Sequence, residues 1–131
     1  MARDASHISD SEWRVMEVLW QQGPCTTTQV LEALADTGWS RNTVATFLTR
    51  LEQKGFLTAL DTSPRQYSPA VTRQEGLTRE NQSFLHRVYH GSVGMLLASF
   101  IQDAQLSDRD AQQLHQLLDE AQARRDKEGS P

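Results

Sequence analysis

The sequence lacks the residues and runs that several classes of protein need. Its 131 residues include one cysteine, Cys25, which excludes an internal disulfide and a four-cysteine metal cluster. No run approaches the ~18 consecutive apolar residues that span a bilayer, and residues 1–10 lack the apolar run of a secretory signal. No Gly-rich phosphate loop, nucleophile elbow or catalytic arrangement of paired carboxylates appears either. We therefore expect a cytoplasmic protein that is not an enzyme and that needs no cofactor.

Charge is unevenly distributed along the chain. The net charge of −4 at pH 7 is unlike that of most nucleic-acid-binding domains. Between residues 39 and 67, however, four basic residues stand against two acidic ones: Arg41, Arg50, Lys54 and Arg65 against Glu52 and Asp61. Local fields decide docking to DNA, so this segment is where a nucleic-acid site is expected.

Capping signals mark the starts of three helices in the first half of the chain. Ser9 with Glu12 and Thr26 with Gln29 have the spacing of a capping box, and Ser40 supplies the third cap. Apolar residues recur at helical spacing behind each signal. The helices are expected to end at or near Gly23, Gly38 and Gly55.

A hairpin is predicted to follow these helices. Residues 56–60 and 66–68 have the character of strands, and residues 61–65 have turn chemistry. Three short helices followed by a hairpin is the order of a winged helix-turn-helix. We therefore predict that residues 1–71 form a winged-helix DNA-binding domain.

Residues 72–131 are predicted to form a helical dimerisation domain. Thr72 with Glu75 forms another capping box, Gly91 breaks the first helix, and Ser107 caps the last one, whose charged tail from Arg124 is expected to fray. Such helices leave too thin a core to stand alone, and a second copy of the chain is the simplest partner. The predicted fold class is mainly α with a small β-hairpin wing. Expected at the dimer interface are Phe84, Val88, Leu96, Phe100, Leu114, Leu117 and Leu118.

The third predicted helix has one apolar face and one polar face. Its apolar residues recur at i, i+3, i+4 and i+7, which is a single buried stripe. The opposite face offers amides, hydroxyls and arginine, and its one nearby acid, Glu52, lies closer to the buried edge. Such a face suits a major groove, although any soluble helix surface can look similar. The predicted DNA-binding residues are Ser40, Arg41, Asn42, Thr43, Thr46, Thr49, Arg50 and, near the wing tip, Arg65; Gln53 lies on the same face.

Three other interpretations are weaker. A winged helix used for protein–protein contact, without sequence-specific DNA binding, would present an apolar or acidic outer face on the third helix. His86 and His90 could share a helix face, but two ligands do not make a metal site, so no metal is expected. Cys25 could sense redox state, yet an inert, half-buried thiol is the simpler interpretation.

Several separated motifs follow one another along residues 8–92, and the similarity that they carry extends to about residue 118. They are Ile8–Trp13, Val15-Met16, Leu19-Trp20, Trp39–Val44, Leu48, Arg50-Leu51, Lys54-Gly55, Tyr67–Pro69, Ser83–Leu85 and Gly91-Ser92. Together they resemble the penicillinase-repressor (BlaI/MecI/CopY) family of bacterial winged-helix transcriptional repressors. The resemblance implies a homodimer on an inverted repeat of double-stranded operator DNA, with recognition helices ~34–36 Å apart or a multiple of that. Such a dimer would repress adjacent genes, for example in resistance or stress response.

The resemblance also suggests how repression could be relieved. In the β-lactam branch of the family, a membrane sensor triggers proteolysis at an Asn-Phe bond in the helix that corresponds to residues 93–103. This chain has Ser99 and Phe100 there, so they are the candidate cleavage site, while packing in the dimer is the simpler role for Phe100. The copper-responsive branch carries paired cysteines near its C-terminus, and their absence here excludes copper sensing by that route.

Overall fold

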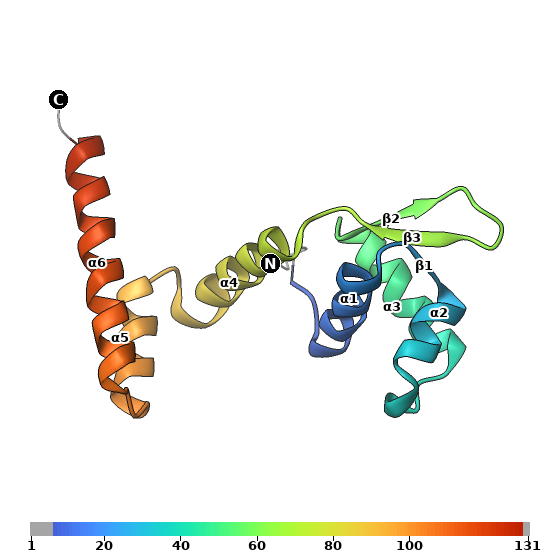
Figure 1. The fold of residues 1–131 in the computed structure, drawn as a ribbon, viewed down its shortest axis with the longest axis horizontal. Coiled ribbons are helices and arrows are strands. Elements are labelled where there is room, and N and C mark those ends of the chain that lie inside the picture. Colours follow the sequence, from blue (N-terminus) through green and yellow to red (C-terminus); the bar gives the residue numbers. More distant parts are fainter. Residues whose placement is uncertain (1–6, 130–131) are drawn as a thin grey trace. The chain divides into compact units, whose positions relative to one another are not determined.

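Helices dominate the computed structural model, which describes residues 7–129 (Figure 1). The elements are α1 (Asp10–Gln22), β1 (Cys25–Thr26), α2 (Thr27–Ala33), the 3-10 turn η1 (Ala35–Thr37), α3 (Arg41–Gln53), β2 (Leu57–Leu60), β3 (Gln66–Pro69), α4 (Arg73–Tyr89), α5 (Val93–Asp103) and α6 (Asp108–Gly129). The predicted fold class is confirmed. No helix within residues 7–129 is both long and apolar enough to cross a membrane.

The capping signals of the sequence form the contacts that they predict. In the first box the backbone N–H of Glu12 donates to Ser9 Oγ at 3.1 Å, and the backbone N–H of Ser9 donates to Glu12 Oε1 at 2.9 Å. Thr26 with Gln29 and Thr72 with Glu75 repeat this exchange at α2 and α4. These local contacts fix the helix starts, because they satisfy backbone donors that have no partner inside the helix.

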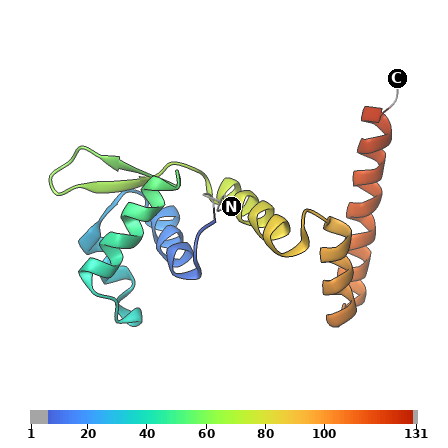
Figure 2. The same ribbon diagram turned by 180° about the vertical axis from the view of Figure 1, so that it is seen from behind.

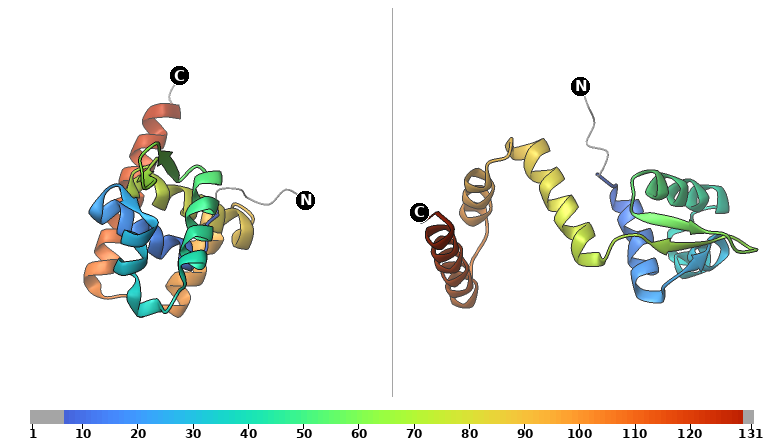
Figure 3. Two further views of the ribbon diagram at one scale, coloured as in Figure 1. Left: turned by 90° about the vertical axis from the view of Figure 1, so that its right-hand side faces the viewer. Right: turned by 90° about the horizontal axis from the view of Figure 1, so that it is seen from above.

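The predicted hairpin is part of a three-stranded antiparallel sheet with the order β1-β3-β2. The two long strands lie within one residue of the expected ranges, and Tyr67 of β3 pairs with Cys25 of β1 and Ala59 of β2. Strand β1 was not predicted, because its two residues, the second of which is the capping residue Thr26, are too few to show alternation. Figure 3 shows the β2–β3 hairpin reaching beyond the helices of its own unit, as a wing does.

The core of this unit lies between α1, α2, α3 and the sheet. On the inner stripe of α3, Val44, Leu48 and Leu51 are fully buried. Phe47 is half-buried and packs edge-on against Trp39, with 5.0 Å between the two ring centroids. The stripe therefore holds the polar side of α3 outward. The buried core comprises Ile8, Val15, Met16, Val18, Leu19, Cys25, Val30, Leu34, Val44, Leu48, Leu51, Phe56, Leu57, Tyr67 and Val71.

Helix α4 packs on the winged-helix core. The indole N–H of Trp20 donates to the Val71 carbonyl at 2.9 Å, and Arg73 pairs with Glu17 of α1 at 3.0 Å. The chain accordingly forms two compact units, residues 1–91 and 92–131, with α4 in the first. The predicted division at residue 71 concerns where DNA binding ends and dimerisation begins, and it stays a prediction.

Gly76 of α4 sits where no side chain fits. A Cβ atom at this position would lie 2.8 Å from Trp20 Cη2 and 3.4 Å from Phe56 Cε1. In an open helix Gly→Ala is worth up to about 1 kcal/mol of added stability. We expect Gly76→Ala instead to lower the free energy of unfolding by about 1–3 kcal/mol, because overpacking pushes on the core. Urea denaturation measures this. Gly94→Ala in α5, where the nearest atom is 4.0 Å away, is the control and should not destabilise; equal effects of both variants would contradict the packing argument.

The second unit is a helical hairpin in which α5 and α6 lie side by side (Figures 1 and 2). Ser107 caps α6 as predicted, accepting from the backbone N–H of Asp110 at 3.0 Å. The tail from Arg124 was expected to fray, but it is helical as far as Gly129. Its residues are good helix formers, and Gln122 donates to Asp126 one turn on at 3.0 Å.

Candidate nucleic-acid interface

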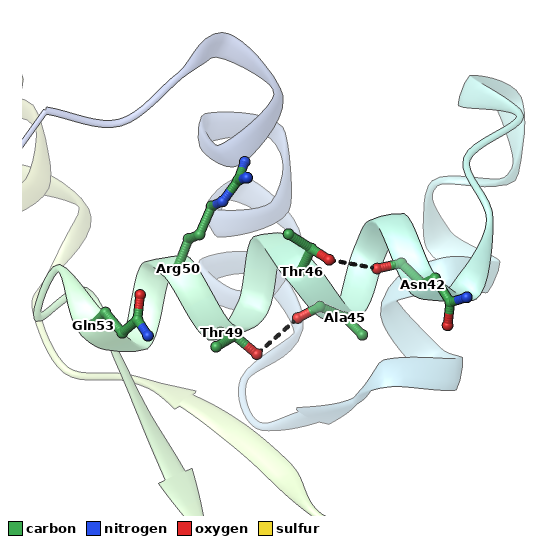
Figure 4. A pocket seen from close by; sticks show the side chains of 6 residues that line it. All are labelled: Asn42, Ala45, Thr46, Thr49, Arg50 and Gln53. Atoms are coloured by element: carbon green, nitrogen blue, oxygen red, sulfur yellow. Dashed lines mark hydrogen bonds between the residues drawn. The ribbon is translucent and has the colours of Figure 1, made fainter.

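The outward face of α3 forms a shallow pocket. Figure 4 shows the side chains that line it, all on this one helix: Asn42, Ala45, Thr46, Thr49, Arg50 and Gln53. Five of the six are exposed, and Ala45 is half-buried. No carboxylate lines the pocket, and Glu52 is solvent-exposed outside it. A polyanion can therefore approach this face without meeting a like charge.

Four of the predicted DNA-binding residues thus lie together in the pocket: Asn42, Thr46, Thr49 and Arg50. Gln53 was recognised on the same face, whereas Ala45 was not anticipated. An alanine carries no hydrogen-bonding group, so sequence analysis gives no reason to select it. Its position one turn before Thr49 is the signal that could have found it.

The first turn of α3 holds the next three predicted residues. Ser40 Oγ accepts from the backbone N–H of Thr43 at 3.1 Å and lies 3.0 Å from the Thr43 hydroxyl. Arg41 Nη2 donates to Thr28 Oγ1 of α2 at 2.7 Å. Arg41 therefore links the two helices of the helix-turn-helix, and Thr28 joins the candidate site as a residue that the sequence analysis missed.

Arg65 lies in the wing, apart from the residues that line the α3 pocket. It is exposed in the turn between β2 and β3. Thr62 orders this turn, because its hydroxyl donates to the Pro64 carbonyl and accepts from the backbone N–H of Gln66, both at 2.9 Å. The wing thus presents a guanidinium from a backbone that is held by its own hydrogen bonds.

A buried ion pair ties the start of α1 to the end of α3. Glu12 is 3% exposed, and its carboxylate accepts from Lys54 Nζ at 2.9 and 3.1 Å. Burial acts to raise the pKa of Glu12, but hydrogen bonds from the Ser9 backbone and from Lys54 outweigh it, so the pKa lies below its ordinary value of 4.5. The capping box of α1 therefore also anchors α3.

This pair makes stability depend on pH in the acid range. A lowered carboxyl pKa means that Glu12 stabilises the fold above about pH 4.5 and loses that contribution as pH falls through the lowered value. We expect Glu12→Gln to lower the free energy of unfolding at neutral pH by about 1–3 kcal/mol and to flatten its decline below pH 4.5. Urea denaturation across this pH range measures both effects.

Glu17→Gln is the matched control for this prediction. Glu17 pairs with Arg73 at the surface, where an ion pair contributes about 0–1 kcal/mol. If the free energy of unfolding of Glu12→Gln falls with pH as steeply as that of the wild-type chain, another carboxylate causes the loss of stability in acid.

The predicted dimerisation residues lie on helices whose apolar surface is largely uncovered. Val88, Phe100, Leu117 and Leu118 are exposed, whereas Phe84, Leu96 and Leu114 are half-buried. Further large apolar side chains that were not predicted are also exposed: Val93, Met95, Ile101 and Leu106. Ser99 and Phe100 lie inside α5, so the bond between them is within a regular helix.

The remaining candidate residues have ordinary surroundings. Cys25 is buried, burial raises its pKa, and its thiol donates to the Gly23 carbonyl at 3.3 Å. A thiol of this kind is a poor nucleophile. His86 and His90 are both exposed, and within residues 7–129 no three His, Cys, Asp or Glu side chains gather to hold a metal ion.

A helix-turn-helix followed by a β-hairpin, with an exposed polar helix face free of carboxylates, defines a winged-helix DNA-binding protein. Residues 8–120 match the family described as penicillinase repressor. The chain therefore belongs to the penicillinase repressor family and is a DNA-binding transcriptional repressor.

Two individual relatives agree with this assignment. The chain is 32% identical over 120 residues to the penicillinase repressor of Bacillus licheniformis, covering 90% of this chain and 94% of that protein. It is 28% identical over 113 residues to the methicillin resistance regulatory protein MecI of Staphylococcus aureus, covering 85% of this chain and 92% of that protein. The solved DNA-binding domain of the repressor BlaI aligns with 54% of this chain and 89% of its own, at 33% identity and a TM-score of 0.49.

Proposed function

We propose that this repressor acts as a homodimer on an inverted-repeat operator, with α3 of each subunit in a major groove. The observation that carries the proposal is the exposed α3 pocket, in which Asn42, Arg50 and Gln53 offer hydrogen bonds. Arg can donate two hydrogen bonds to guanine, and Asn or Gln can form a bidentate pair with adenine. We assign contacts with phosphates to Arg41, in the first turn of α3, and to Arg65, in the wing.

Dimerisation is assigned to the helices that leave apolar side chains in water. A lone unit of two helices cannot bury both of its apolar faces, and a second copy of α5 and α6 supplies matching ones. In this arrangement Phe100 packs in the interface. Cleavage between Ser99 and Phe100 would require α5 to open first, so we assign Phe100 a packing role, and a membrane-bound sensor protease stays a prediction.

The experiment that tests this function is selection of duplexes from a random DNA pool by the purified full chain. We expect an inverted repeat whose half-site centres lie one helical turn apart, or a multiple of it. Failure to enrich any motif by a folded, dimeric chain would contradict sequence-specific binding and favour a winged helix used for protein–protein contact.

Arg65→Ala tests the assignment of the wing to the DNA backbone. A phosphate contact weakens binding about equally on all sequences, and its loss lowers the slope of log affinity against log salt by about one unit. Gel-shift titrations at several salt concentrations, with the recovered operator and a scrambled duplex, measure both quantities. A wild-type slope in the variant would place Arg65 away from phosphate.

A further inference from the structure

The outward face of α3 carries a group of short side chains between Asn42 and Gln53. Residues four apart lie in rows along a helix, and the pocket is made of two such rows: Asn42, Thr46 and Arg50, and Ala45, Thr49 and Gln53. A threonine occupies the middle of each row, and Ala45 adds a methyl group beside them (Figure 4). Asn42 and Gln53 therefore lie at the two ends of the face, and the short side chains of Ala45, Thr46 and Thr49 lie between them, with Arg50 beside Thr49.

The hydrogen of each threonine hydroxyl is already used inside the helix. Thr46 Oγ1 donates to the Asn42 carbonyl at 2.9 Å, and Thr49 Oγ1 donates to the Ala45 carbonyl at 3.0 Å, as the dashed lines of Figure 4 show. Each hydroxyl hydrogen is thereby turned back to the backbone of α3. Both side chains are exposed, so on this face each can offer a ligand its Cγ2 methyl group and a hydroxyl oxygen that can only accept.

In the major groove the 5-methyl group of thymine is the apolar feature that distinguishes one base from the others, and alanine or threonine methyl groups are suitable partners for it. We propose that Thr46, Thr49 and Ala45 form an apolar patch that receives thymine 5-methyl groups in each half-site. Arg50, Asn42 and Gln53 hydrogen-bond the neighbouring bases. This assignment rests on the proposed function, because it requires α3 to lie in a major groove.

The first test removes the methyl group from the DNA. The operator recovered by selection is synthesised with thymidine and, base by base within a half-site, with deoxyuridine, which keeps every hydrogen-bonding group. Burying one methyl group is worth about 0.8 kcal/mol, so each uracil opposite the patch should weaken binding roughly fourfold. Uracil outside the half-sites is the control and should leave affinity unchanged.

The second test removes the methyl group from the protein. Thr46→Ser keeps the hydroxyl and loses the methyl, whereas Thr46→Val keeps a methyl and loses the hydroxyl. We expect the serine variant to bind the thymine operator roughly fourfold more weakly and to lose its preference for thymine over uracil. The valine variant should bind like the wild-type chain. The same pair of variants at Thr49 examines the second row, and Thr78→Ser on the exposed surface of α4 is the matched control.

The outcomes separate this inference from the function on which it rests. Selection without an inverted repeat contradicts the proposed function itself. When an inverted repeat is recovered, equal binding of the thymine and uracil duplexes overturns the inference and leaves the repressor assignment intact. A valine variant that binds at least fourfold more weakly than the wild-type chain also overturns it, because the threonine hydroxyl would then be the group that contacts DNA.

Discussion

Replacing Arg50 with alanine is expected to weaken binding to the operator by roughly 10- to 100-fold, the value of one good bidentate base contact. Arg50 is exposed, lines the α3 pocket and lies off the buried stripe of the helix. Its removal should therefore leave the free energy of unfolding and the dimer unchanged. Gel-shift titration with the recovered operator measures the loss, and circular dichroism confirms the fold.

Two further variants make this result specific. Arg50→Lys keeps the charge but loses the planar fork, so it should lose most of the discrimination between operator and scrambled DNA while keeping non-specific affinity. Arg124→Ala on α6 removes the same charge outside the winged helix, and it should leave operator affinity unchanged. If Arg50→Ala binds the operator as tightly as the wild-type chain, Arg50 is outside the interface.

The second large effect is expected at the dimer interface. Leu118 is 59% exposed on α6, so an aspartate there costs little in a single subunit. In a dimer that covers this surface, the same aspartate would bury an unpaired charge, a penalty of several kcal/mol. We therefore expect Leu118→Asp to convert the dimer to monomer at micromolar concentration, as measured by sedimentation velocity, and Leu114→Asp to do the same.

The two leucines differ in burial, which affects how each aspartate variant is interpreted. Leu114 is half-buried and, with Leu118, Ile101, Leu106 and Ala111, lines an apolar groove of the α5–α6 hairpin, so its aspartate variant could also loosen that hairpin. Leu118→Asp is the cleaner variant. Gln112→Asp adds the same charge on the opposite side of α6 and should remain dimeric. A Leu118→Asp chain that sediments as a dimer contradicts the proposed pairing through α6.

Local signals in the sequence were sufficient for most of the winged helix. Capping boxes at Ser9, Thr26 and Thr72 act between residues three apart, so they can be read without knowledge of the fold. The apolar stripe of α3 likewise predicted which side faces outward, and hence the exposed residues of the candidate site. The family resemblance is confirmed by the match over residues 8–120.

What could not be predicted depends on contacts between distant residues. The Glu12–Lys54 pair joins positions 42 residues apart. In the sequence, Glu12 indicates only the start of a helix and Lys54 only the end of one. Gly76 looks like a weakness in a helix until Trp20 is placed against it. Arg41 was predicted only as a DNA-binding residue. Its hydrogen bond to Thr28 depends on how α2 packs on α3. Assignment of individual residues to DNA or to the dimer stays a prediction.

In the proposed function, two copies of this chain bind one inverted repeat. Sedimentation velocity of the full chain, mixed with the recovered operator and with a duplex in which one half-site is scrambled, tests it most directly. We predict a complex of two chains per intact duplex and a marked loss of affinity when one half-site is scrambled. A complex of one chain per duplex, or equal binding to both duplexes, would contradict the account.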